Sequence, residues 1–470
     1  MSPRSYDVVV VGSGFAGLAA ADLLGGHDLR VLLVDENRHL GGQVLRRMPL
    51  KPGGQWRLES DPLKRIGFGL TDGVRRKGIE ILNRAQVFGT SPKRVLYIED
   101  LRGRIIEAEA EYIVFAAGAR EKFLPFRGWT LPGVISTGAA QILMKSSGVL
   151  PAAETLVGGS GPLLLVLANE ILKNGGRVPA VLDGVHFLDQ MKFLTLWRHQ
   201  SRKLIEIAII LSRLLASRVP VKHGVRILEA RGKGELEEVI TIRIDRQGRN
   251  IPGTEAKVKT ACLAVGHGFA SNLELPQLAG CKMEYRADRG GWIVSVDEHL
   301  ETSVANVFAA GELTGIAGSG KAFLEGQMAA LAILRKFGLL DERGFFGRWA
   351  ILHKERQRQL DFGKFVNDLC RIPPASYAAI PDETIVCRCE DVTMGEIRRQ
   401  IRSGFSTPGA LKKATRSGMG YCQGRVCGPM LQDLSALFSG KAGRDLEPLP
   451  VRMPVKPVRL EVLAGLNERA

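Results

Sequence analysis

Short apolar runs alternate with helical stretches along the first two thirds of the chain. Residues 7–11 (Asp-Val-Val-Val-Val) are followed by a glycine-rich turn, a helical stretch through Leu24 and a second apolar run over 30–34. Continuous apolar runs of this length, bounded by turns and helices, predict parallel strands that are buried on both faces. The same order of strand, glycine turn and helix returns over 154–164. We therefore predict an α/β chain with two domains of the dinucleotide-binding type.

The first glycine turn is Gly12-Ser-Gly14-Phe-Ala-Gly17, and the strand after it ends in Asp35. Gly12 permits the tight turn, Gly14 lets a pyrophosphate approach the backbone, and Gly17 lets the helix pack close to the strand. The pyrophosphate is expected at the helix N-terminus, where free N–H groups favour anions. Asp35 is placed to accept hydrogen bonds from a ribose 2′-OH. We expect four further residues to line this nucleotide: Glu36, Gly42, Gln43 and Val87.

Two later segments identify the nucleotide as FAD. The segment 112–120 ends a buried strand at Gly118, and the segment 306–312 ends another at Gly311-Glu312. In two-domain flavoproteins that resemble glutathione reductase, such segments close the FAD site. The acid after the second segment is usually Asp in these proteins, and here it is Glu312.

The second glycine turn, Gly159-Ser-Gly161-Pro-Leu, departs from the first. Leu164 stands at the third glycine position, and Pro162 removes one N–H near the turn. Asp183 ends the following strand. We predict a second nucleotide here, with NAD(P), ATP or FMN as alternatives. The competing interpretation is an inserted domain that keeps the fold and has lost its ligand. No cysteine pair stands near the expected flavin position, which excludes dithiol exchange.

Four of the seven cysteines form two tight pairs near the C-terminus: Cys387 with Cys389, and Cys422 with Cys427. Four thiolates are the ligand set of a [2Fe–2S] cluster. Zinc also accepts four thiolates, although its ligand pairs more often follow a C-x₂₋₄-C spacing. A capping box at 393–396 and a Thr-Pro pair at 407–408 predict two short helices between the pairs. A redox cluster is the leading hypothesis, and a structural zinc site is the alternative.

Composition narrows the class of protein. The net charge of +16 indicates either a solvated basic surface without a specific role or attraction for anionic ligands, an acidic partner or a membrane surface. Nucleic acid is not expected, since aromatic residues make up only 6% and no basic stripe interleaves with them. No secretory pattern and no long uncharged apolar stretch is present, so we expect a cytoplasmic protein. The apolar stretch 204–216 is predicted to be a packed or interface helix.

The cluster segments 387–392 and 415–427 resemble the cluster domain related to bacterioferritin-associated ferredoxin. The segment 119–134 is similar to one in the α subunits (the A-type chains) of heteromeric dye-linked amine dehydrogenases, and 265–269 (Val-Gly-His-Gly-Phe) also fits. This family includes the A chain of opine oxidase, the B chain of hydrogen cyanide synthase, and the α subunits of D-hydroxyproline and L-proline dehydrogenases. Sarcosine oxidase α is a more distant relative. The resemblance covers nearly the whole chain.

The resemblance implies an FAD- and [2Fe–2S]-containing electron-transfer subunit of a dehydrogenase that acts on an amino acid or secondary amine. A substrate-oxidising flavoprotein β subunit is the implied partner, with a small third subunit in some complexes. We find no convincing catalytic base in this chain, and we interpret His267 as structural. The alternatives are a self-contained NAD(P)H-dependent flavoprotein reductase and a non-catalytic scaffold or redox-sensing subunit.

The predicted architecture is a glutathione-reductase-like flavoprotein with a small C-terminal helical [2Fe–2S] domain. Its expected segments are 1–149 and 266–335 for the FAD domain, 150–265 for an inserted nucleotide-binding-like domain, 336–380 for a helical linker, 381–440 for the cluster domain and 441–470 for a proline-containing tail.

Overall fold

The computed structural model describes residues 3–46, 61–191 and 197–467, which form two compact units. The first unit comprises Met1–Arg120, Ser271–Lys364 and Val451–Ala470, and the second comprises Glu121–Ala270 and Phe365–Pro450. The six predicted segments divide the chain differently, and their bounds stay a prediction. The predicted α/β fold class is confirmed.

The first unit is built on a seven-stranded sheet with the order β3-β2-β1-β6-β5-β4, and β19 also pairs with β6. The strands β3, β2, β1, β6 and β19 are parallel, whereas β4 and β5 form an antiparallel extension. The first predicted strands are confirmed as β1 and β2. The bounds are β1 Arg4–Val11, β2 Val31–Asp35, β3 Glu80–Asn83, β4 Gln86–Thr90, β5 Val95–Glu99, β6 Ile105–Phe115 and β19 Val307–Ala309.

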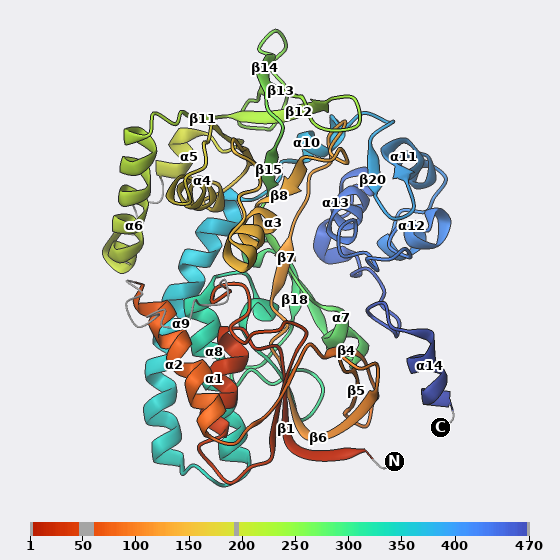
Figure 1. Cartoon of the computed structure of the whole chain (residues 1–470). Helices are drawn as coiled ribbons and strands as arrows, with labels where there is room; N and C mark the ends of the chain where they lie inside the picture. Colours follow the sequence, from red (N-terminus) through yellow and green to blue (C-terminus); the bar gives the residue numbers. More distant parts are fainter. Residues whose placement is uncertain (1–2, 47–60, 192–196, 468–470) are drawn as a thin grey trace. The chain divides into compact units, whose positions relative to one another are not determined.

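Helices α1 (Phe15–Leu24) and α8 (Ser319–Lys336) pack side by side in this unit (Figure 1). Their contact is close because both present small residues; a Cβ on Gly326 would collide with the backbone of Ala16. Strand side chains and both helices share one apolar core. The remaining elements that lie within this unit are α2 Pro62–Arg76, α7 Glu274–Leu278, β17 Met283–Arg286, β18 Gly291–Val294 and α14 Leu460–Asn467. Helix α9 (Glu342–Leu369) continues from the first unit into the second.

The second unit contains a five-stranded parallel sheet with the order β11-β10-β9-β15-β8. The predicted strand, turn and helix over 154–164 are confirmed as β9 and α4. An antiparallel sheet, β12-β13-β14, completes this part. The bounds are β8 Val134–Ser136, α3 Thr137–Ile142, a π-helical turn Leu143–Ser147, β9 Leu156–Gly159, α4 Leu163–Lys173, β10 Val181–Asp183, α5 Phe187–Met191, α6 Trp197–Ala216, β11 Val221–His223, β12 Val225–Arg231, β13 Glu238–Arg243, β14 Ala256–Lys259, β15 Leu263–Gly266 and β16 Phe269–Ser271.

The C-terminal part of the second unit is a small bundle of three mutually packed helices, α11, α12 and α13 (Figure 1). The predicted capping box is confirmed: Glu396 N–H donates to the Thr393 hydroxyl, and the Glu396 carboxylate accepts from Thr393 N–H. The predicted second helix is also confirmed, and it begins at Pro408. The bounds are α10 Pro374–Ala378, β20 Ile385–Cys387, β21 Val392–Thr393, α11 Met394–Arg402, α12 Pro408–Thr415 and α13 Gly428–Ser439.

Helix α6 contains the predicted 204–216 stretch and carries an unusual surface. Ile210 and Leu214 are buried in a core that they share with α4, as a packed helix requires. Ile205, Ile209 and Leu215 are more than half exposed on another face. In the described part of the chain, no helix is both long and apolar enough to cross a bilayer.

Candidate functional site

The first glycine turn has the geometry of a nucleotide site. Gly12 has φ +101°, a conformation that L side chains rarely adopt, and its N–H donates to Val34 O at 2.8 Å. A Cβ on Gly17 would collide with the carbonyl oxygen of Gly12, so only glycine lets α1 approach so closely. Gly14 caps α1, and among the described residues no atom beyond its chain neighbours and the α1 backbone lies within 4 Å of where its Cβ would be. The backbone is therefore open at the point where we expect the pyrophosphate.

Asp35 lies at the end of β2 and is fully engaged by the chain. Its Oδ2 accepts from the N–H and the hydroxyl of Ser13, both at 2.6 Å. Its Oδ1 accepts from the N–H and the side-chain amide of Asn37, at 2.7 and 2.9 Å. A carboxylate has about four acceptor directions, and all four are taken. Asp35 thus fixes the turn, and its predicted contact with a ribose stays a prediction.

The other residues predicted at this site surround the same edge of the sheet. Val87 is buried in β4. Gly42 packs against Gly14 so closely that a Cβ on Gly42 would lie 2.9 Å from the Gly14 Cα. Gln43 is exposed. The Glu36 side chain is 55% exposed and forms an ion pair with Lys456. Lys456 was not predicted, because it lies some 420 residues further along the chain.

The two segments predicted to close the FAD site lie in the same unit. Gly118 follows β6 with φ +71°, and Asn272 N–H donates to its carbonyl at 3.1 Å. The Glu312 carboxylate accepts from Ala317 N–H at 3.0 Å and Gly318 N–H at 2.7 Å. Burial raises the Glu312 pKa. This carboxylate holds the loop before α8, a role that the sequence did not suggest.

A buried charged network lies beneath the Gly311 turn. The Lys321 ammonium donates to Gly311 O at 2.6 Å and pairs with Glu325 at 3.1 Å. Glu325 accepts from Gly311 N–H at 2.9 Å and from Arg356 Nε at 2.7 Å. Both Lys321 and Glu325 have no exposed surface. The sequence prediction missed this network. The available signal was a Lys–Glu pair, four residues apart, within an apolar helical stretch.

The second glycine turn is covered by a residue from the end of α9. A Cβ on Gly161 would lie only 2.3 Å from Cys370 Sγ, and the Cys370 thiol contacts Ser160 O at 3.7 Å. Burial raises the Cys370 pKa to about 12. Leu164, at the third glycine position, is 1% exposed in the core. The turn therefore has the expected backbone and lacks the open approach seen at Gly14.

Asp183, the predicted acid of the second site, is also engaged by the chain. It accepts from Val185 N–H at 2.9 Å and from the Gln190 side chain at 2.6 Å. Burial raises its pKa to about 7. Asp183 thus stabilises the local turn, and its predicted nucleotide contact stays a prediction.

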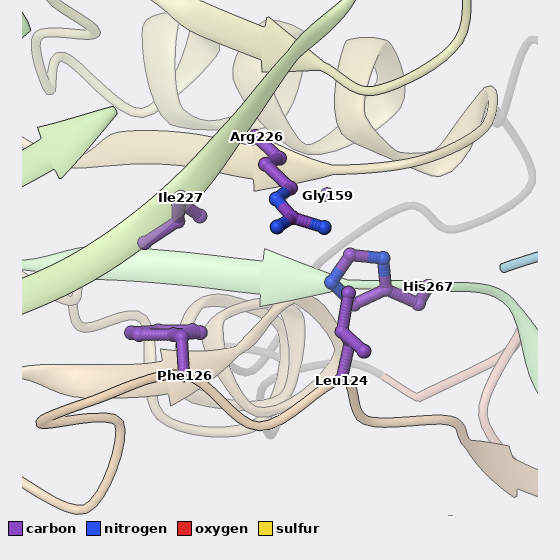
Figure 2. Close-up of a pocket in the computed structure, with 6 residues that line it drawn as sticks. All are labelled: Leu124, Phe126, Gly159, Arg226, Ile227 and His267. Atoms are coloured by element: carbon purple, nitrogen blue, oxygen red, sulfur yellow. The ribbon is translucent and has the colours of Figure 1, made fainter. Parts of the chain in front are cut away.

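A small pocket remains beside the second turn (Figure 2). Its lining is Leu124, Phe126, Gly159, Arg226, Ile227 and His267. The cavity measures about 10 Å³, room for about one water molecule. Burial and the charge of Arg226 lower the His267 pKa to about 4, so the ring is neutral at physiological pH. His267 Nδ1 lies 3.3 Å from Ser160 Oγ, which is consistent with the structural role predicted for this histidine.

The four C-terminal cysteines come together at one end of the small helical bundle. Their thiols fall into two contacting pairs, Cys387 with Cys427 and Cys389 with Cys422. The Cys427 thiol and the backbone N–H groups of Gly418, Cys389 and Glu390 lower the Cys387 pKa to about 5. The hydrogen bond between the Cys427 and Cys387 side chains raises the Cys427 pKa, and burial raises it further. Strand β20 and the turn before α13 bring these pairs together.

This donor set fits a [2Fe–2S] cluster better than a single zinc ion. Two irons take two thiolates each, whereas zinc takes four ligands around one point. Cys427 immediately precedes α13, whose N-terminus favours negative charge. A Cβ on Gly420 would collide with Cys389, so glycine allows the close approach of the two cysteine loops.

Comparisons with known proteins identify the families to which the two parts of the chain are similar. The chain matches the pyridine nucleotide-disulphide oxidoreductase family over residues 6–330 and the BFD-like [2Fe-2S] binding domain over 385–436, a range that contains all four cysteines. The opine oxidase A chain of Rhizobium meliloti is 31% identical, over 99% of this chain and 88% of that protein. The hydrogen cyanide synthase component HcnB of Pseudomonas aeruginosa is 30% identical, over 98% and 99%. The solved L-proline dehydrogenase from P. horikoshii is 20% identical with a TM-score of 0.71, covers 98% and 80% of the two chains, and shares the fold.

Proposed function

Because the chain belongs to the pyridine nucleotide-disulphide oxidoreductase family and has full-length relatives among the A chains of opine oxidases, we propose that it is the electron-transfer subunit of a heteromeric dehydrogenase that oxidises an amino acid or secondary amine. The protein is an FAD-dependent oxidoreductase with a [2Fe–2S] domain. Opine, hydroxyproline, proline or glycine-type substrates are the classes that we propose.

The observation that carries this proposal is the presence of four paired thiols in the same chain as an open nucleotide turn. Bound FAD supplies two-electron chemistry, and a [2Fe–2S] cluster supplies one-electron chemistry. We propose that Gly12, Gly14 and Gly17 hold the nucleotide and that the four cysteines hold the cluster. A chain with both groups can take electrons from a partner and release them singly to an acceptor.

The relatives are named as subunits, so this chain is expected to work with partners. We propose a flavoprotein β subunit that carries the substrate-oxidising flavin, and a small third subunit in some assemblies. The exposed apolar face of α6, with Ile205, Ile209 and Leu215, supports contact with another protein, because soluble monomers rarely expose such patches. A cytoplasmic complex with peripheral membrane contact is the location that we propose.

The main alternative, a self-contained NAD(P)H-dependent reductase, has less support. That reaction needs an open second turn for the nicotinamide nucleotide, and here Cys370 covers Gly161. Buried Leu164 also fills the position where the third glycine allows close helix packing. Rapid bleaching of the flavin by NADH or NADPH would favour this alternative.

Metal and flavin analysis of the anaerobically purified chain tests the proposal. We expect bound FAD, about two irons and two labile sulfides per chain, and a paramagnetic signal after reduction with dithionite. Cys387→Ser should lose iron, whereas Cys281→Ser, which alters a buried thiol outside the site, should retain it. Stoichiometric zinc in place of iron would contradict the proposal and leave the cysteines a structural role.

A further inference from the structure

The C-terminal tail of the first unit is fixed along the strand that borders the first nucleotide site. Val455 N–H donates to Phe88 O at 2.8 Å, and the Gln86 side chain donates to Pro457 O at 2.8 Å. Val455 is 1% exposed and belongs to the same core as Val87. The tail is thus an integral edge of this domain, attached on both sides of Lys456.

Lys456 extends from this fixed backbone to the end of β2. Its ammonium pairs with Glu36, and the Asp35 carboxylate is close enough to act on its charge. Burial lowers the Lys456 pKa, and the negative charge of Asp35 opposes that shift. One cation therefore stands beside two adjacent acids at the position where a Rossmann-type site binds the ribose.

The two acids are not equivalent. Asp35 has its acceptor directions filled by Ser13 and Asn37. Glu36 remains 55% exposed, and the partner that the structure gives it is the ammonium at the end of the flexible Lys456 side chain. Glu36 therefore keeps hydrogen-bonding capacity that Asp35 has already committed to the chain.

We propose that Lys456, beside the Glu36 already predicted at this nucleotide, binds the adenosine end of the ligand, so that the C-terminal tail is part of the cofactor site. The Glu36 carboxylate accepts hydrogen bonds from ribose hydroxyls. The Lys456 ammonium donates a hydrogen bond to the same end of the ligand and offsets the charge of the two acids. The ligands are adenine nucleotides with a free 2′-OH, including FAD and ADP; the inference rests on the proposed FAD site.

Titrations of the full chain, stripped of flavin, with FAD and separately with ADP test this inference. Lys456→Met is expected to weaken both affinities by about tenfold, because a hydrogen bond to a charged group is lost. Glu36→Gln should weaken both in the same direction. Arg459→Met is the matched control: it removes another cation of the same tail, which pairs with Glu99 at 2.7 Å. It should leave both affinities unchanged.

Three results would overturn the inference. Lys456→Met could bind FAD and ADP as tightly as the wild type, or Arg459→Met could lose as much affinity, which would make the tail a structural support only. A wild-type chain that binds neither nucleotide would overturn the FAD site as well. Iron content, measured on the same samples, reports separately on the cluster. A failure of this inference about Lys456 can therefore be distinguished from a failure of the proposed electron-transfer function.

Discussion

The chain builds the same strand, glycine turn and helix twice, and only the first copy has an open approach for a ligand. At Gly14 no residue that the structure describes occupies the space where a Cβ would lie, whereas at Gly161 the thiol of Cys370 lies 2.3 Å from that position. The surroundings differ too. The first site rests on the paired charges of Lys321 and Glu325, and near the second site His267 is kept neutral. A glycine motif thus identifies a turn, and residues far away in the sequence decide whether it can bind.

The largest expected effect concerns the charged support of the first site. Glu325→Gln should lower the free energy of unfolding by about 3–5 kcal/mol, since it leaves the buried charges of Lys321 and Arg356 without their partner. Chemical denaturation of the flavin-free chain measures this. A loss below about 1 kcal/mol would mean that the network does not support the site.

The next effect separates the two turns directly. Gly14→Ala should weaken FAD binding by about 10- to 100-fold, because an intruding methyl group costs about 1–3 kcal/mol, while the flavin-free fold stays intact. Gly161→Ala should do the reverse, lowering thermal stability through its clash with Cys370 and leaving FAD content unchanged. Flavin titration and thermal unfolding of both variants provide the measurement. An equal loss of flavin from the two variants would contradict the distinction between an open first turn and a covered second turn.

A pH series tests the second site alone. Asp183 has a folded-state pKa of about 7, above the unfolded value of about 3.9. Its folded form therefore binds a proton that the unfolded chain has lost, and wild-type stability should fall as pH rises from about 4 to 7, by at most about 1.4 kcal/mol per pH unit. Asp183→Asn should remove this part of the slope. Identical slopes in urea titrations of the two proteins would contradict the assignment.

The smallest effect comes from uncovering the second turn. Cys370→Ala removes the thiol and should cost about 1 kcal/mol of stability. NADH should bleach the flavin in neither the wild type nor this variant, because buried Leu164 still holds its position. Stopped-flow absorbance records the result. Bleaching of the flavin in the wild type would contradict the proposed difference between the two turns. Bleaching in the variant alone would mean that Cys370, and not Leu164, prevents NADH from binding at the second turn.

Local patterns in the sequence were sufficient for several elements, and they indicated a candidate cysteine site. The apolar runs predicted β1 and β2, the capping box at Thr393 predicted α11, and the spacing of the cysteines indicated a pair of metal-binding loops. Contacts between distant segments could not be predicted in this way. Lys456 reaches Glu36, and Cys370 covers Gly161, through tertiary packing that leaves no local periodicity. The hydrogen bonds from Ser13 and Asn37 to Asp35 could not be predicted for a different reason. The sequence shows that an acid ends the strand, but not whether its carboxylate is already hydrogen-bonded by the chain.

The most direct test follows the cluster during turnover of the chain in complex with the proposed β subunit. Samples frozen at intervals after addition of the amine are examined by EPR, with substrate consumption measured in parallel. The account predicts that the signal of the reduced cluster grows at the rate of substrate oxidation and is lost in Cys387→Ser. A cluster that stays oxidised while substrate is consumed would contradict electron transfer through this chain.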